Sequence, residues 1–84
     1  MYEVIMAYVP EIAFKSDNIR ECVQYIKDNE LVEYHDHLDY CQHCAENYER
    51  PADYYPTYFV DYENRTYDIT DIYVLERLLN ERGI

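Results

Sequence analysis

The sequence predicts an α+β domain with a small three-stranded, mainly antiparallel sheet and three helices, in the order β-α-α-β-β-α. Three observations lead to this prediction. The N-terminus is a nearly continuous apolar run of strand length, two stretches in the middle carry apolar residues at helical spacing, and the last third combines alternating residues with a final helical stretch. The chain has 84 residues and shows no linker or internal repeat, so we expect residues 1–84 to form a single compact domain.

The first strand is predicted within Tyr2–Val9, because this run has the length and the β-branched content of a strand covered on both faces. A short connection follows, and Ser16 or Asp17 caps the first helix. The apolar positions of this helix follow the i, i+3, i+4, i+7 pattern: Ile19, Cys22, Val23 and Ile26. We expect the helix to end near Asp28 or Asn29.

A second helix is predicted from about Leu31 to Glu49, because one stripe of this stretch is apolar and a proline follows its end. The residues of the stripe are spaced alternately three and four apart: Leu31, Tyr34, Leu38, Cys41, Ala45 and Tyr48. The turn-rich residues 51–56 then bend the chain back toward extended structure.

A hairpin and a last helix complete the predicted fold. The hairpin strands run from Thr57 to Tyr62 and from Thr66 to Ile69, around a turn at residues 63–65. The last helix carries its apolar residues on one side: Ile72, Leu75, Leu78 and Leu79. It ends at Gly83, which suits the left-handed residue after a helix. We expect the helices to pack mainly on one face of the sheet.

The composition excludes several enzyme classes. The only glycine is Gly83, the penultimate residue, so the chain has no glycine-rich phosphate loop, dinucleotide fingerprint or nucleophile elbow. The only serine is Ser16, at the expected helix cap, and no Ser-His-Asp arrangement can be argued around it. We therefore expect a protein that is not an enzyme and uses no cofactor.

The chain is strongly acidic. It has 18 Asp and Glu against 7 Lys and Arg, which gives a formal net charge of −11. This charge argues against direct binding of nucleic acid or of an anionic membrane, and it favours a cationic partner. The N-terminal run contains Glu3 and Pro10 and lacks the basic start of a signal peptide, and three cysteines suit a reducing compartment, so we expect a cytoplasmic protein.

All three histidines and two of the three cysteines lie between Tyr34 and Cys44, which raises the hypothesis of a small zinc-binding regulator. His37, Cys41 and Cys44 share one helix flank, and Cys22 of the preceding helix would complete a tetrahedron. The spacing supports zinc only in part, because structural zinc sites usually combine ligands from separated segments. Packing explains Cys22 and Cys41, which lie on the apolar stripes of their helices. We therefore predict no metal ligand and keep zinc binding as an alternative.

The sharpest feature of the sequence is an acidic stretch from Asp28 to Glu49. It contains seven acids and no Lys or Arg: Asp28, Glu30, Glu33, Asp36, Asp39, Glu46 and Glu49. At about 100° per residue, the side of the helix away from the apolar stripe carries Glu33, Asp36, Asp39, Tyr40, His43 and Glu46. The acids are spaced on the order of 5 Å apart along the helix, against roughly 3.4 Å per phosphate along one DNA strand. The row is either a hydrated face that favours solubility or a surface for a basic partner.

In size, charge and composition the chain resembles, as a class, the small acidic phage-encoded inhibitors that imitate nucleic acid, including many anti-CRISPR and anti-restriction proteins. The resemblance rests on these general properties and on the acidic helix. It implies a basic nucleic-acid-binding partner, such as a nuclease, a CRISPR effector, a polymerase or a nucleoid protein, in the cytoplasm of the host cell.

We therefore predict a non-enzymatic inhibitor whose acidic, tyrosine-containing face imitates nucleic-acid phosphates. The residues expected to contact the partner are Glu33, Asp36, Asp39, Tyr40, Glu46, Tyr54 and Tyr55. Tyrosine is abundant, with 12 Tyr against 2 Phe and no Trp, and it supplies contact area and ring faces for arginine. An acidic adaptor or toxin-neutralising protein is the alternative, and a homodimer is compatible with either function.

Overall fold

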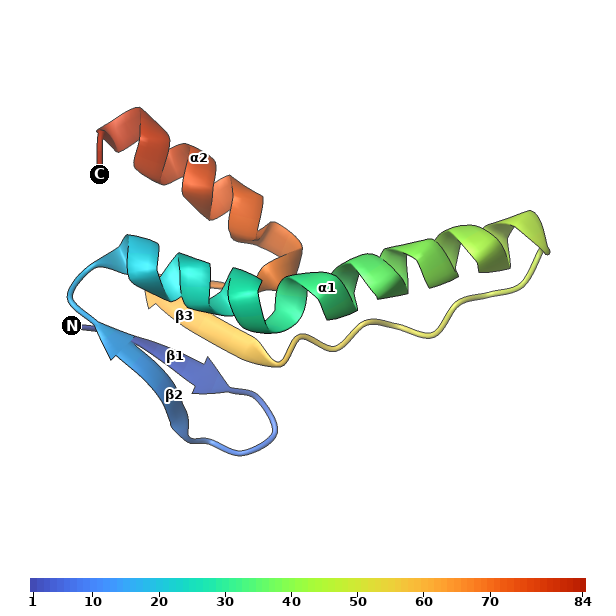
Figure 1. Cartoon of the computed structure of the whole chain (residues 1–84), viewed down its shortest axis with the longest axis horizontal. Coiled ribbons are helices and arrows are strands. Elements are labelled where there is room, and N and C mark those ends of the chain that lie inside the picture. Colours follow the sequence, from blue (N-terminus) through green and yellow to red (C-terminus); the bar gives the residue numbers. More distant parts are fainter.

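A computed structural model describes all 84 residues and shows four strands and two helices (Figure 1). The elements in chain order are β1 (Tyr2–Met6), β2 (Ile12–Ser16), α1 (Ile19–Glu46), β3 (Tyr58–Tyr62), β4 (Arg65–Tyr67), the single 3-10 turn η1 (Ile69–Asp71) and α2 (Ile72–Arg82). The fold is α+β with one four-stranded antiparallel sheet, so the predicted three strands and three helices are wrong.

The strand that the sequence analysis missed is β2. It pairs antiparallel with β1, so that Val4 lies opposite Phe14 and Glu3 opposite Lys15. The apolar run that begins at Tyr2 therefore forms a strand only as far as Met6, and the chain then turns back. The composition of β2 hid the strand, because alanine and lysine are depleted in strands.

The two helices predicted on either side of Asn29 are one continuous helix, α1, of 28 residues. Its N-cap is Asn18, whose side chain accepts a hydrogen bond from the backbone N–H of Arg20 at 3.0 Å. No proline or glycine interrupts α1. Asn29 does not end the helix; its side-chain amide donates instead to the carbonyl oxygen of Tyr25 at 2.8 Å.

One hydrophobic core joins the sheet to both helices. Its 12 buried residues are Val4, Ile19, Cys22, Val23, Ile26, Val60, Tyr62, Tyr67, Ile69, Ile72, Leu75 and Leu79. The strand order is β2-β1-β3-β4, and side chains alternate across the sheet. Val4 and Val60 therefore face the helices, whereas Ile5 and Asp61 are exposed on the opposite face. The helices pack on one face of the sheet and leave the other face open.

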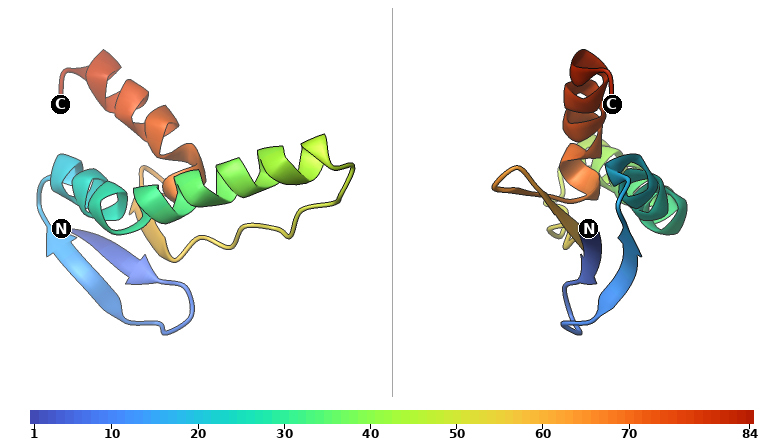
Figure 2. Two further views of the ribbon diagram at one scale, coloured as in Figure 1. Left: turned by 45° about the vertical axis from the view of Figure 1, so that its right-hand side comes forward. Right: turned by 90° about the vertical axis from the view of Figure 1, so that its left-hand side faces the viewer.

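The second half of α1 projects beyond the sheet, and the chain after it returns alongside the helix in extended form (Figures 1 and 2). We call residues 31–57 the arm. A helix of 28 residues is about 42 Å long, which accounts for the longest extent of the molecule, 45 Å. Neither helix combines the length and the apolar character that crossing a membrane requires.

Candidate functional site: an acidic face on the arm

The helical part of the arm carries four exposed carboxylates, which we call the acidic face: Glu33, Asp36, Asp39 and Glu46. The structure contains four ion pairs, and none of them includes a residue of the acidic face. Only Glu46 takes part in a side-chain hydrogen bond, which it accepts from Gln42 at 3.5 Å. The arm contains one Lys or Arg, Arg50. The charges of the acidic face are therefore uncompensated by the protein itself.

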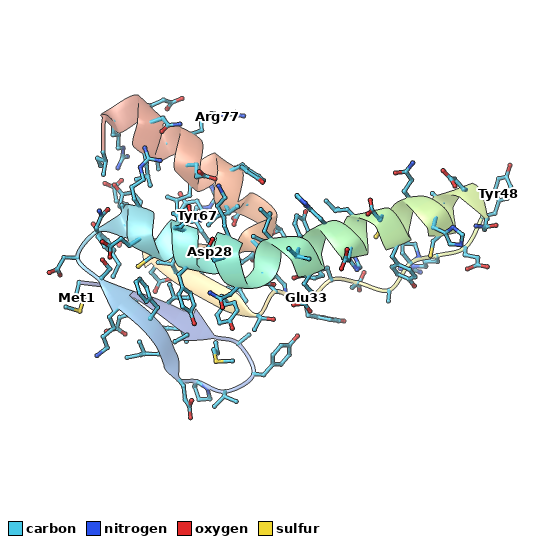
Figure 3. All side chains as sticks on the ribbon, viewed as in Figure 1. Met1, Asp28, Glu33, Tyr48, Tyr67 and Arg77 are labelled. Atoms are coloured by element: carbon cyan, nitrogen blue, oxygen red, sulfur yellow. The ribbon has the colours of Figure 1, made fainter.

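The acidic face occupies one side of α1. At 3.6 residues per turn its four side chains fall within a sector of about 140°, and from Glu33 to Glu46 they extend over about 20 Å. Figure 3 labels Asp28 and Glu33 on α1 and Tyr48 just after its end, and the three follow one another from the body of the protein to the far end of the arm. The result is a row of negative charge on a straight element that stands clear of the sheet.

Glu30, another acid of the same stretch, is an internal structural residue. Its side chain is 1% exposed and accepts three hydrogen bonds: from the Tyr54 hydroxyl at 2.5 Å, from the Thr57 N–H at 2.9 Å and from the Tyr58 N–H at 3.1 Å. The donors come from the returning chain and from the start of β3. Glu30 thus fastens the base of the arm to the sheet, whereas the sequence alone showed it only as one of the seven acids of the stretch.

Aromatic contacts hold the returning chain against α1. The Tyr54 ring lies 5.0 Å from the His37 ring and 5.2 Å from the Tyr34 ring, measured between centroids. Burial, reinforced by the hydrogen bond to Glu30, raises the pKa of Tyr54 well above its ordinary value. Further along the arm, the Tyr40 hydroxyl accepts a hydrogen bond from the Ala52 N–H at 3.3 Å. The arm is therefore a two-layered element and its carboxylates project from an ordered support.

The tyrosines expected at the interface differ in their exposure. Tyr55 is 68% exposed and Tyr40 is 44% exposed, so both offer free surface on the arm. Tyr54 is partly buried, and its hydroxyl is engaged by Glu30. Tyr48, which the sequence analysis assigned to the apolar stripe, is 100% exposed at the tip of the arm. The helix ends at Glu46, two residues before Tyr48, and only the position of that end could have revealed the exposure.

The inner side of the arm also differs from the predicted apolar stripe. Leu38 and Ala45 are exposed, whereas His37, Cys41 and the buried Cys44 lie on the inner side with Tyr34. The layer that covers this side of the arm is the extended chain 50–57, which is a single segment wide. The residues of α1 that this segment covers therefore include histidine and cysteine as well as apolar residues.

The structure separates the residues that the zinc hypothesis combined. Because α1 is continuous, Cys22 in the core lies at least 15 residues from His37 along one helix, which is about 22 Å. Cys41 Sγ lies 3.2 Å from His37 Nε2, but no group of three or more His, Cys, Asp or Glu side chains could hold a metal ion. Burial raises the pKa of the Cys22 thiol, as expected for a packed core cysteine.

Comparisons with protein-family models, with curated proteins and with solved structures found no match. No residue role can therefore be transferred to this chain from another protein. The acidic face and its exposed tyrosines are the candidate site on the strength of their own charge, exposure and geometry.

Proposed function

We propose that this protein is a non-enzymatic inhibitor that binds a basic nucleic-acid-binding protein in the cytoplasm and occupies the surface that would otherwise hold phosphates. One observation carries the proposal. Four exposed carboxylates stand on a single supported helix, and no cation of the protein pairs with any of them. A surface of this kind attracts a positively charged groove and repels nucleic acid itself.

The spacing of the acidic face supports contact with a groove that binds phosphates. Glu33, Asp36 and Asp39 follow at steps of three residues, or about 4.5 Å of helix rise. One strand of DNA presents a phosphate every 3.4 Å or so of helix axis. The first three carboxylates therefore offer a charge density close to that of a short stretch of nucleic-acid backbone.

Two exposed tyrosines of the arm provide contacts that charge alone does not. Tyr40, on the helix, and Tyr55, on the returning chain, are exposed on the same arm as the carboxylates. Aromatic side chains are enriched at protein interfaces, and their rings attract arginine. We infer that the carboxylates guide the encounter and that these tyrosines contribute to the affinity of the bound state.

The test begins by identifying a partner with the tagged protein and then measures the affinity of the purified partner. The decisive variant is Asp36→Lys combined with Asp39→Lys. Its control reverses two exposed acids away from the arm, Glu11→Lys with Glu81→Lys. Both variants change the net charge from −11 by the same amount, so a difference between them reports position rather than total charge.

We expect the arm variant to lose at least a hundredfold in affinity, because a close charge pair at an interface contributes on the order of 1.5–7 kcal/mol. The control should lose less than tenfold. Binding should also weaken with salt and be displaced by the nucleic acid that the partner normally holds. Equal losses of affinity for the two variants would refute the claim that the acidic face contacts the partner. Binding without competition from nucleic acid would favour the adaptor function instead.

A further inference from the structure

A shallow pocket lies on the body of the protein, outside the acidic face, where α1 passes over β2. It has a volume of about 280 Å³ and is lined by Phe14, Glu21, Gln24, Tyr25 and Asp28. Pockets that take drug-sized ligands usually measure about 300–1,000 Å³. This pocket therefore suits one long side chain better than a cofactor.

Two aromatic rings form the apolar part of the pocket. The rings of Phe14 and Tyr25 stack with their centroids 4.9 Å apart and their planes 11° from parallel. Tyr25 is held in turn by an edge contact with Tyr58, at 5.6 Å between centroids. The ring pair is thus fixed by the sheet below it, and both rings are partly exposed to the pocket.

Two carboxylates stand on the rim of the pocket. Glu21 accepts a hydrogen bond from the Ser16 hydroxyl through Oε2, at 2.8 Å, and Asp28 accepts one from the Gln24 amide through Oδ1, at 2.7 Å. In each case one carboxylate oxygen makes no hydrogen bond within the protein. Neither residue belongs to an ion pair. The rim therefore combines two oriented anions with free acceptor oxygens above an aromatic floor.

Elsewhere in the molecule, tyrosine rings are covered by cations of the protein itself. Arg65 lies 4.7 Å above the centre of the Tyr67 ring, and Lys27 lies 5.6 Å above that of Tyr73. The rings of Phe14 and Tyr25 have no such cation. We propose that the pocket binds an arginine side chain of the basic partner, a planar cation that stacks on aromatic rings and donates several N–H groups to carboxylates.

The position of the pocket links it to the acidic face. Glu21, Asp28, Asp39 and Glu46 follow at steps of 7, 11 and 7 residues, each close to a whole number of helical turns. The four carboxylates therefore lie on one side of α1, spread over about 38 Å measured along the helix. This inference rests on the proposed function, because the arginine belongs to the partner that the acidic face attracts.

The pocket can be tested without the partner. The probe is arginine blocked at both ends, N-acetyl-arginine methylamide, titrated into the isotope-labelled protein while the NMR signals of each residue are followed. The matched probe is the equivalent citrulline derivative, which has nearly the same shape and no charge. We expect the arginine probe to shift the signals of Phe14, Tyr25 and their neighbours, and the citrulline probe to shift them at least fivefold less.

Two double variants locate the binding. Glu21→Gln with Asp28→Asn removes the rim charges without changing side-chain size, and Asp39→Asn with Glu46→Gln removes two charges from the arm as the control. The pocket variant should weaken binding of the probe at least fivefold, and the control less than twofold. A third variant, Phe14→Leu, removes one ring and should also weaken the probe. Thermal unfolding of each variant confirms that the fold is retained.

Three outcomes would overturn the proposal: equal shifts by both probes, shifts centred on the arm, or equal effects of the two double variants. The proposed function is tested separately by reversal of Asp36 and Asp39. If that reversal abolishes partner binding while the arginine probe does not shift the signals of the pocket residues, only the pocket inference fails. If the probe binds and the reversal has no effect, the proposed function fails.

Discussion

Replacing Glu30 tests the claim that one buried carboxylate positions the arm. We consider Glu30→Gln, which keeps the size of the side chain and removes its charge. The carboxylate accepts from Tyr54 and Thr57 through Oε2 and from Tyr58 through Oε1. The glutamine amide has one acceptor oxygen, so when that oxygen replaces Oε2, its NH₂ group faces the Tyr58 N–H, and two donors oppose each other.

The expected loss follows from these three contacts. Hydrogen bonds to a charged group contribute about 1.5–3 kcal/mol each, and those to a neutral group about 0.5–1.5 kcal/mol. Two bonds therefore weaken by about 1 kcal/mol each, and the third donor is left unsatisfied at a cost of about 1–3 kcal/mol. The sum, about 3–5 kcal/mol, is a large part of the 5–15 kcal/mol typical of a folded domain.

Urea unfolding followed by far-UV circular dichroism at constant pH measures this loss. The matched control is Glu33→Gln, three residues along the same helix and exposed, which should change the free energy of unfolding by less than about 0.5 kcal/mol. Amide hydrogen exchange at Thr57 and Tyr58 should accelerate in Glu30→Gln and stay unchanged in the control. A loss below about 1 kcal/mol in Glu30→Gln, or equal losses in the two variants, would refute the assigned role of Glu30.

Three further predictions concern the residues after the two helices, the titration of Tyr54 and the cysteines. Tyr48 has a φ of 56°, so Tyr48→Gly should raise the free energy of unfolding by about 0.5–1 kcal/mol by relieving left-handed strain. Gly83 has a φ of 69°, so Gly83→Ala should lower the free energy of unfolding by about 1 kcal/mol in the same urea assay. Burial raises the pKa of Tyr54 above its ordinary 10.0, so the unfolded chain loses the hydroxyl proton at a lower pH than the folded protein does. The contribution of Tyr54 to stability should therefore be intact below pH 10 and fall as the pH rises above it. Melting temperatures measured against pH should fall less steeply in Tyr54→Phe. Iodoacetamide at pH 8 should modify the partly exposed Cys41 and spare the buried Cys22, whose pKa is raised by burial. Both cysteines should react in denaturant. Mass spectrometry of peptides measures the order of modification, and reaction of Cys22 before Cys41 in the folded protein would contradict the prediction.

Glu30 and Glu33 show how far the sequence could predict the site. Both are glutamates in the same acidic helix, and helical periodicity alone distinguishes them only weakly. What separates them is the approach of residues 54–58, which lie more than 20 positions further along the chain. The exposure of Glu33, Asp36 and Asp39, in contrast, was predicted correctly, because all three lie away from the apolar stripe visible in the sequence.

The sequence predicted the helical segments and the hairpin of residues 57–69, but the prediction was wrong at Asn29 and at residues 12–16. The sequence near Asn29 contains a residue that often ends helices, but its side chain bonds back to the helix and the core continues past it. The strand Ile12–Ser16 contains only one β-branched residue, Ile12, beside alanine, lysine and serine, and its pairing with β1 supplies what local propensity does not. The first error arises because Asn29 is held inside the helix by a bond to the preceding turn, and the second because a long-range strand pairing overrules local preference.

The continuity of α1 has a consequence for the arm as a binding element. Starting a helix is the unfavourable step, whereas each added residue costs little. The first half of α1 is fixed by the core residues Ile19, Val23 and Ile26, so the arm grows from a turn that is already formed. A partner therefore meets carboxylates whose backbone is ordered in advance, and little conformational entropy is lost on association. The same core that folds the protein keeps a row of mutually repelling charges on one continuous helix.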